Sequence, residues 1–405
     1  MLYHLNEMSH AAAAPLLWWS QVGSKLFSHP YSALSYAPLS RNFAASCELF
    51  SRIVQRYDKP EFGITETTVK GKTVAVTQTI ALSKPFCNLQ HFQRAVKNND
   101  PKVLIVAPLS GHHSTLLRDT VRTFLPDHDV YITDWIDARM VPIHDGAFHF
   151  DDYVAYVKEF IRYLGDGVHV VSVCQPTVPV LAAVSLMAQA GEKITPRSMT
   201  MMGGPIDARR SPTSVNSYAR EKPIQWFEKH VIARVPMRYP GAGRRVYPGF
   251  LQHMGFVAMN PDKHIQSHWD FFDHLLQGDG ESASEHRKFY DEYNAVLDMP
   301  ADYYLETVKM VFQDFDLAKG NMRVAGELVK PETIKKTALL TVEGELDDIS
   351  GGGQTSAAQQ LCKGIPNTRK HHYDAEQCGH YGIFSGRRFR EKIYPNIRTF
   401  IRKYD

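Results

Sequence analysis

The feature that most constrains the fold is the stretch from Gly167 to Ala182, GVHVVSVCQPTVPVLA, which changes character at Cys174. Before the cysteine, the chain is rich in β-branched residues with no polar alternation, which is typical of a strand buried on both faces of a parallel sheet. From Val178 onward, apolar side chains recur at helical spacing. The stretch therefore predicts a strand, an abrupt turn and a helix, with a cysteine at the corner.

This corner is where α/β-hydrolases carry their nucleophile, usually within G-x-S-x-G, because small residues two positions away relieve the cramped turn. Here Ser172 and Pro176 take those two positions around Cys174. Pro176 suits the first turn of a helix, where its missing N–H costs nothing. The pattern is degenerate, so a buried and inert thiol at a strand end is the alternative interpretation.

Strand and helix patterns alternate on both sides of this corner. The series predicts an α/β protein with a mostly parallel, doubly wound sheet, which is the architecture of the α/β-hydrolase fold. Asp151 is the predicted N-cap of one of the helices. The predicted strands are a hairpin at 67–82 and single strands at 102–108, 129–135, 168–173, 198–202, 338–342 and 370–373.

The alternation breaks once, and the break suggests a domain division. Residues 1–60 form an N-terminal helical segment and residues 61–208 the first part of the hydrolase core. Residues 209–330 are rich in aromatic residues and histidine, and we interpret them as a helical cap inserted into the sheet. Residues 331–405 complete the core.

Composition excludes several classes. The net charge of +3 comes with no long basic run, so no nucleic-acid partner is expected, and we interpret Arg244-Arg245 as a solvated face. Five cysteines with no C-x-x-C pair fit a reduced, cytoplasmic protein without a metal site. The sequence lacks a transmembrane segment, and its N-terminus is a poor signal peptide. Ala11–Trp19 could lie on an apolar surface, but we favour packing on the enzyme's own core.

A nucleophile of this kind needs a base and an orienting carboxylate, and α/β-hydrolases carry them after successive later strands. G-E-L-D-D follows the strand at 338–342, and C-G-H-Y-G follows the strand at 370–373. These positions predict a catalytic triad of Cys174, Asp347 and His380. Asp348 is the rival acid. His371 and His372 are rival bases, but they fall inside a strand.

Two backbone N–H groups should stabilise the oxyanion that forms during acyl transfer. One belongs to Gln175, the residue after the nucleophile. The other comes from the loop after the strand at 102–108, where Pro108 has no N–H, so Leu109 or Ser110 is the expected donor. His112 and His113 in the same loop are candidates for the pocket wall.

Four segments together resemble the cysteine-type intracellular poly(3-hydroxybutyrate) depolymerases, and the resemblance spans nearly the whole chain. It implies a Cys-Asp-His triad, an amorphous intracellular polyester substrate, peripheral residence on cytoplasmic storage granules, and 3-hydroxybutyrate units as products. No cofactor is implied, although coenzyme A could replace water as the acyl acceptor. The segments are V-C-Q-P-T-V-P at 173–179, P-L-S-G-H-H at 108–113, E-G-E-L-D-D-I at 343–349 and C-G-H-Y-G at 378–382.

Two alternatives stay open. A polyhydroxyalkanoate synthase shares the fold and a Cys-Asp-His set, but its elbow is usually G-x-C-x-G-G, whereas Pro176 and Thr177 replace both glycines here. A non-catalytic granule protein related to phasins would be nearly all helix and would not need a triad in this order. The sequence does not determine the oligomeric state or the side-chain length of the polyester.

Overall fold

The computed structural model describes residues 2–96 and 99–405, and within these ranges nine strands form one sheet. Three strands at one edge run antiparallel to their neighbours: β1 (Glu66–Val69), β2 (Lys72–Lys84) and β3 (Cys87–Arg94). The other six are parallel in the order β5 (Asp129–Trp135), β4 (Lys102–Val106), β6 (Val168–Val173), β7 (Ser198–Met202), β13 (Ala338–Gly344) and β14 (Lys370–Ala375).

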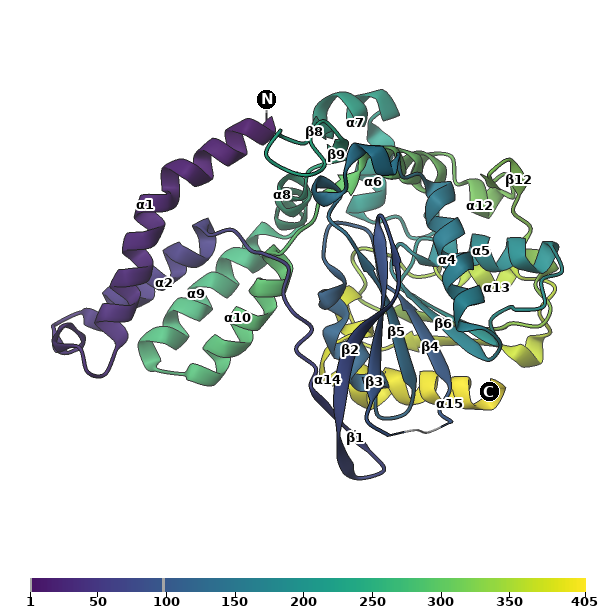
Figure 1. The fold of residues 1–405 in the computed structure, drawn as a ribbon, viewed down its shortest axis with the longest axis horizontal. Coiled ribbons are helices and arrows are strands. Elements are labelled where there is room, and N and C mark those ends of the chain that lie inside the picture. Colours follow the sequence, from purple (N-terminus) through teal and green to yellow (C-terminus); the bar gives the residue numbers. More distant parts are fainter. Residues whose placement is uncertain (1, 97–98) are drawn as a thin grey trace.

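Helices follow the parallel strands, so that strand, helix and strand alternate along the chain (Figure 1). Helix α4 packs on α5, and α15 packs against β7 and β13. This arrangement confirms the predicted α/β-hydrolase fold. The helices are α3 (Arg118–Phe124), α4 (Phe150–Leu164), α5 (Thr177–Gln189), α13 (Ala357–Leu361), α14 (Gly386–Arg388) and α15 (Tyr394–Tyr404).

The N-cap predicted for α4, Asp151, was wrong by two residues. The helix begins at Phe150, so His149 is its N-cap, and the His149 backbone N–H donates to the Asp152 carboxylate at 2.8 Å. Asp151 lies inside the first turn and instead accepts a hydrogen bond from the Ala325 backbone N–H. Aspartate is favourable throughout the first turn of a helix, so the residue type alone does not fix the cap position.

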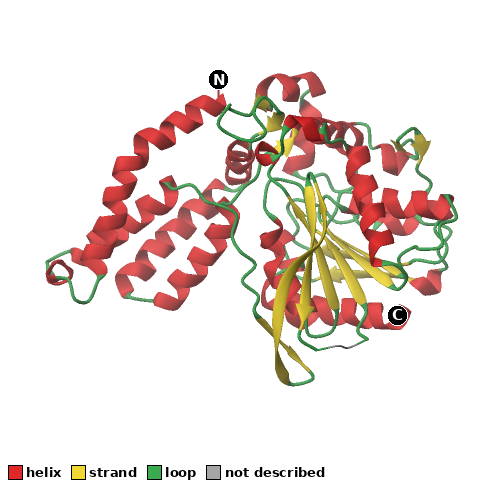
Figure 2. Cartoon of the chain, viewed as in Figure 1, coloured by secondary structure: helices red, strands yellow, loops and turns green. Residues whose placement is uncertain are grey.

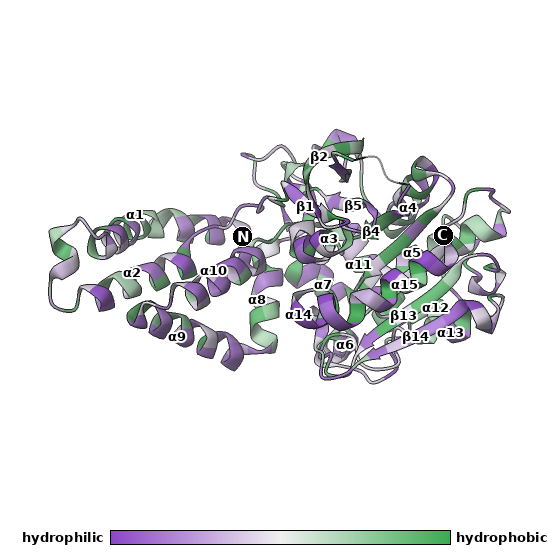
Figure 3. Ribbon diagram, turned by 90° about the horizontal axis from the view of Figure 1, so that it is seen from below, coloured by the Kyte–Doolittle hydropathy of each residue, from purple (hydrophilic) through white to green (hydrophobic). Residues whose placement is uncertain are grey.

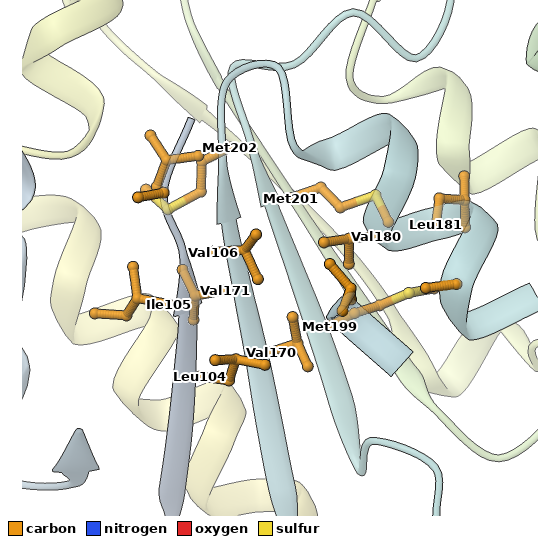
Figure 4. Packing of buried hydrophobic residues seen from close by; sticks show 14 of the residues in the cluster. Leu104, Ile105, Val106, Val170, Val171, Val180, Leu181, Met199, Met201 and Met202 are labelled. Atoms are coloured by element: carbon orange, nitrogen blue, oxygen red, sulfur yellow. The ribbon is translucent and has the colours of Figure 1, made fainter. Parts of the chain in front are cut away.

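The core lies on the central strands, and β6 is buried along its whole length, as its β-branched sequence predicts. Side chains of β4, β6 and β7 pack together with Val180 and Leu181 of α5 (Figure 4). Full burial of one such aliphatic side chain contributes about 1.5–3 kcal/mol. This packing holds the carboxyl end of β6, where Cys174 follows, in a fixed position.

A long insertion separates β7 from β13. Its predicted limits, 209 and 330, fall in connecting segments, and we propose to keep them as its boundaries. The helices of the insertion are α6 (Ser214–Glu221), α7 (Ile224–Val231), α8 (Gly249–Met259), α9 (Pro261–Gln277), α10 (Gly280–Asn294), α11 (Ala301–Thr307) and α12 (Asp316–Lys319). Its short strands are β8 (Ala233–Arg234), β9 (Arg245–Tyr247), β10 (Met299–Pro300), β11 (Arg323–Val324) and β12 (Glu327–Leu328).

Part of this insertion joins the N-terminal helices in an all-helical arm. The arm consists of α1 (Leu2–Ser28), α2 (Ser40–Val54), α9 and α10. Figures 1 and 2 show these four helices extending away from the sheet. Two ion pairs of 2.6 Å join α2 to α10, one between Arg52 and Asp291 and one between Glu48 and Arg287. The insertion therefore does more than cover the core, because two of its helices also complete a separate helical layer.

Helix α1 is tied to the core at its start. The Tyr3 hydroxyl, which is buried, donates a 2.8 Å hydrogen bond to the Asp298 carboxylate. Further along α1 the large apolar side chains are exposed, since Trp18 is 56% exposed and Trp19 is 65% exposed. The expectation that this segment packs on the enzyme's own core was therefore wrong. Seen from below, the arm carries apolar as well as polar residues (Figure 3). No helix among the described residues is long and apolar enough to cross a membrane.

Candidate active site

Cys174 occupies a strained turn between β6 and α5. Its φ is 68°, in the left-handed region that residues with a side chain rarely adopt. The turn is held from both sides, because the Cys174 N–H donates to the Met202 carbonyl at 2.7 Å and the Cys174 carbonyl accepts from Thr177 at 3.1 Å. Strain of this kind persists only where the surroundings enforce it, and it gathers at functional sites. The geometry matches the strained turn that presents a hydrolase nucleophile.

Two glycines after β7 make room for this turn. A Cβ on Gly204 would lie 1.9 Å from Thr177 Oγ1 and 2.6 Å from the Cys174 carbonyl oxygen. Gly203 has a φ of 55°, and a Cβ there would lie 3.3 Å from both the Asp347 carboxylate and the His380 ring. The chain therefore needs glycine at both positions, because any side chain would push the turn and the His380–Asp347 pair apart.

His380 and Asp347 lie against each other beyond the ends of β14 and β13. The distance from His380 Nδ1 to Asp347 Oδ2 is 2.8 Å, and both side chains are buried. The other carboxylate oxygen of Asp347 accepts hydrogen bonds from the backbone N–H groups of Ile349 and Ser350, at 2.9 and 2.8 Å. Both carboxylate oxygens are thus occupied, which fixes the orientation of the imidazole ring.

The rival acid does not pair with His380, and the rival bases do not pair with Asp347. Asp348 is exposed and accepts a 3.2 Å hydrogen bond from the Asn260 side chain. His371 and His372 lie within β14, whereas His380 follows the end of that strand. His372 lies 2.9 Å from Asp374 and 3.9 Å from Glu343. These three side chains could approach a metal ion together, but both oxygens of Glu343 already accept backbone N–H groups.

The electrostatics of His380 fit an imidazolium. Burial by itself lowers the pKa of His380, because it penalises the charged ring. The charges of Cys174 and Asp347 outweigh this effect, so the pKa of His380 is raised well above its ordinary value. Cys174 is thus one of the two groups that favour the charged form of the His380 ring. A cysteine beside an imidazolium reacts as its thiolate.

The loop that carries Leu109 and Ser110 follows β4, which pairs with β6 up to Val106 and Ser172. The backbone N–H groups of Gln175, Leu109 and Ser110 have no hydrogen-bond acceptor within the part of the chain that the structure describes. Just before this loop, the Ala107 carbonyl accepts hydrogen bonds from Trp135 Nε1 at 2.8 Å and from the Tyr153 hydroxyl at 3.2 Å. These two aromatic side chains hold the start of the loop. Neither could be assigned from the sequence, because their contact depends on the pairing of β4 with β5.

A cavity of about 560 Å³ opens beside His380. Its walls come from the loops after β13 and β14 and from α8, α9 and α10 of the insertion. Apolar and aromatic side chains dominate, which suits an ester with apolar substituents. The insertion therefore lies on the His380 side of the sheet. The apolar lining residues are Phe256, Met259, Phe289, Tyr290, Tyr293, Leu346, Ile349 and Tyr381.

His112 and His113 are not among the residues that line this cavity, although His112 contacts one that does. His112 is buried, stacks on Phe256 with 4.8 Å between ring centres, and lies 3.1 Å from the Tyr293 carbonyl. Burial lowers the pKa of His112 to about 4 and that of His113 to about 3. Both rings are neutral near pH 7, and His112 joins the loop to the insertion.

Arg244 also differs from expectation. It is buried, and its guanidinium donates to the backbone carbonyls of Val141, Pro142 and Gly146. The adjacent Arg245 pairs with Glu228 and Asp302. Neither arginine is a freely solvated charge, because two basic residues in sequence say nothing about the carbonyl groups that the fold brings around them.

Comparison with known proteins identifies a family. A family model described as PHB de-polymerase C-terminus matches residues 203–405, just over half of the chain, and this part contains Asp347 and His380. No curated protein matches the chain.

Solved structures of similar fold include hydrolases at low sequence identity. A monoacylglycerol lipase from Paleococcus ferrophilus is 11% identical with a TM-score of 0.44, covering 76% of this chain and 96% of that one. A thermophilic esterase from Thermogutta terrifontis is 12% identical with a TM-score of 0.41, covering 84% and 97%. A 2-hydroxy-6-oxo-6-phenylhexa-2,4-dienoate hydrolase from Rhodococcus sp. strain RHA1 is 10% identical with a TM-score of 0.42, covering 81% and 99%. On the evidence of the family model, the chain belongs to the PHB de-polymerase C-terminus family.

Proposed function

We propose that the protein is an intracellular depolymerase that cleaves ester bonds of amorphous poly(3-hydroxybutyrate) through an acyl intermediate on Cys174. The observation that carries this proposal is the buried His380–Asp347 pair beside a cysteine with left-handed backbone. The family match supports ester hydrolysis as the reaction class and the polyester as substrate. The proposed catalytic triad is Cys174, His380 and Asp347.

In the first half-reaction, the Cys174 thiolate attacks an ester carbonyl carbon of the polymer. The carbonyl oxygen becomes an oxyanion, and we assign its stabilisation to the Gln175 N–H and to the N–H of Leu109 or Ser110. The carbon–oxygen bond of the ester then breaks and a thioester remains on Cys174. The departing alkoxide takes a proton from the His380 imidazolium, while Asp347 keeps the ring in the required tautomer.

In the second half-reaction, an acceptor takes the acyl group from Cys174. His380, now neutral, removes a proton from the acceptor, which attacks the thioester carbon as the carbon–sulfur bond breaks. The thiolate and the imidazolium are thereby restored. With water as acceptor the product is a 3-hydroxybutyrate unit, and with coenzyme A it is the corresponding thioester. The enzyme needs no cofactor of its own, and coenzyme A acts as a substrate if it is used.

We place this reaction at the surface of cytoplasmic storage granules, because an insoluble polyester cannot diffuse to the enzyme. Three observations support this placement. The five cysteines are all free, which suits a reducing compartment. The exposed Trp18 and Trp19 on α1 offer an apolar contact surface outside the active site. The cavity beside His380 is lined largely by apolar side chains.

A polyhydroxyalkanoate synthase-like acyltransferase is the second candidate, and the elbow argues against it. Pro176 is the N-cap of α5 at the position where a synthase usually carries glycine. A non-catalytic granule protein is the candidate of another class. It gives no reason for a buried acid–base pair beside a strained cysteine.

One experiment separates these candidates. The purified protein is incubated with amorphous poly(3-hydroxybutyrate), with and without coenzyme A, and the products are identified by mass spectrometry. Release of 3-hydroxybutyrate units or their thioesters by the wild type, and not by Cys174→Ala, supports the depolymerase. Chain growth from 3-hydroxybutyryl-coenzyme A would indicate the synthase. Absence of any conversion would contradict both enzymatic roles.

A further inference from the structure

Buried polar atoms without partners gather next to the nucleophile. Within the part of the chain that the structure describes, neither polar atom of the Gln175 carboxamide has a hydrogen-bond partner, and the Tyr303 hydroxyl has none. Gln175 is 7% exposed and Tyr303 is 1% exposed. Buried polar groups are nearly always paired, so unpaired ones require an explanation. One explanation is that a bound substrate supplies the missing hydrogen-bond partners.

The two side chains come from different parts of the chain. Gln175 follows Cys174 directly at the start of the turn, whereas Tyr303 belongs to α11 of the insertion. The Tyr303 ring stacks on Tyr153, with 5.4 Å between ring centres and 12° between planes, and packs on Phe148 at 5.8 Å. The Tyr303 N–H also donates to the Phe148 carbonyl at 3.2 Å. The ring is thus fixed in place.

The Tyr303 ring lies near the carboxyl ends of β4 and β6, because Tyr153, on which it stacks, donates a hydrogen bond to the Ala107 carbonyl just after β4. Burial raises the pKa of Tyr303 well above the ordinary tyrosine value, the Thr307 and Gln175 side chains lower it in part, and the Cys174 charge raises it further. Tyr303 therefore keeps its proton and can donate a hydrogen bond. Gln175 can donate through Nε2 and accept through Oε1. Together they offer two donors and an acceptor close to the sulfur that would carry the acyl group.

The chemistry of the acyl group suggests what these groups bind. In a 3-hydroxyacyl group, the carbonyl oxygen is the first polar atom and the oxygen on the third carbon is the second. The proposed function places the carbonyl oxygen at the Gln175 backbone N–H. The Gln175 side chain then belongs to the residue that holds the first oxygen. Only one carbon atom of the acyl chain lies between the carbonyl carbon and the carbon that carries the second oxygen. Gln175 and Tyr303 are therefore suitably placed for that second oxygen.

We infer that the Gln175 carboxamide and the Tyr303 hydroxyl form a subsite that hydrogen-bonds the oxygen on the third carbon of the acyl group. This inference rests on the proposed function and adds to it a selection for 3-oxygenated acyl esters over plain fatty acyl esters. A site built to bind a substrate oxygen discriminates strongly against an analogue that lacks it, because its own polar groups then stay buried and unpaired.

The test compares two esters with the same leaving group, 4-nitrophenyl 3-hydroxybutyrate and 4-nitrophenyl butyrate. The wild type should have the higher kcat/KM for the 3-hydroxybutyrate ester. Tyr303→Phe and the near-isosteric Gln175→Met should each lower that preference by about tenfold or more. Tyr304→Phe, on the same helix but packed on Tyr247 at 4.3 Å, is the matched control and should keep the wild-type preference.

The other outcomes each overturn the inference. Equal losses on both esters would mean that Gln175 and Tyr303 only position the turn around Cys174. An unchanged preference in both variants would mean that these atoms hold an ordered water molecule and do not contact substrate. A wild type that cleaves both esters equally, in a reaction that Cys174→Ala abolishes, would refute the subsite and leave the proposed function intact. A wild type that cleaves neither ester would instead count against the proposed function.

Discussion

The imidazole of His380 and the carboxylate of Asp347 are 2.8 Å apart, although they lie 33 positions apart in the sequence. Neighbouring parallel strands bring them together, because β13 and β14 pair in register and each residue follows the carboxyl end of its strand. Cys174 follows the carboxyl end of β6, which is another parallel strand of the same sheet. The predictions below depend on this common position of the three residues.

The first prediction concerns Cys174. Replacing Cys174 with alanine should abolish ester cleavage, because no other side chain can form the acyl intermediate, and mass spectrometry of the wild type with a slow ester should locate an acyl adduct on Cys174. Cys174→Ser should keep only a small fraction of the activity, since a hydroxyl is far less acidic than a thiol. A folded alanine variant with near wild-type turnover would contradict the assignment.

The second prediction compares adjacent acids. Asp347→Asn should lower kcat by roughly 10³- to 10⁴-fold, because the amide cannot hold His380 in the same tautomer. Asp348→Asn should cost much less, since Asp348 is exposed and bonded only to Asn260 among the described residues. Steady-state kinetics on one soluble ester checks both variants. The opposite ranking would transfer the role of the acid to Asp348.

The third prediction is a pH dependence. Burial lowers the pKa of His380, but the charges of Cys174 and Asp347 raise it further than burial lowers it. The imidazolium that protonates the leaving group is therefore present throughout the neutral range and is lost only as pH rises through this raised pKa. The pH profile of kcat/KM should stay level past the ordinary histidine pKa and fall only at alkaline pH. In Asp347→Asn the residual activity should fall at lower pH, because one of the raising charges is gone.

The fourth prediction tests the close approach of Gly204 to the turn. In Gly204→Ala the new Cβ would overlap Thr177 and the Cys174 carbonyl, so the variant should lose most of its activity and about 1–3 kcal/mol of stability. Gly255→Ala in α8 is the matched control, because nothing lies within 4 Å of its Cβ position. There the exchange should be neutral or slightly stabilising, as alanine is the better helix residue. Thermal unfolding and ester kinetics measure both effects.

The fifth prediction concerns the exposed tryptophans of α1. Replacing Trp18 and Trp19 with serine should leave the unfolding temperature and the hydrolysis of a soluble oligomer nearly unchanged, because both side chains are more than half exposed. Co-sedimentation with polyester granules should weaken. Unchanged sedimentation would assign granule binding to another surface, and loss of soluble activity would contradict the separation between these tryptophans and the active site.

Much of the active site could be predicted because its signals are local. The β-branched run before Cys174 indicates a buried strand, and Asp347 follows a second buried strand, whereas His380 follows the more exposed strand β14. The order of strands along the chain is then enough to place all three residues after the carboxyl ends of parallel strands in one sheet. The choice of Asp347 over Asp348 also followed from local spacing, and the hydrogen bonds of Asp347 agree with it.

Other features depend on contacts between distant segments and leave no local signal. Tyr303 lies 128 positions beyond Gln175, and nothing in its neighbouring residues indicates that α11 returns to the elbow. The arm likewise depends on pairing of α2 with α10, whose charged residues look like ordinary surface residues in sequence. His112 and His113 were expected at the pocket because they follow a strand, but the loop turns them into contacts with the insertion and with the interior.

The hydrogen bond between Tyr3 and Asp298 also has a consequence for synthesis of the protein. The ribosome makes Tyr3 almost first, but 294 further residues must be added before Asp298 appears. Proteins usually fold from the N-terminal end as they emerge. Here the start of the first helix can reach Asp298 only after the inserted segment has been made, whereas its later part can already pack on α2. The hydrogen bond that attaches α1 to Asp298 therefore forms late in the synthesis of the protein.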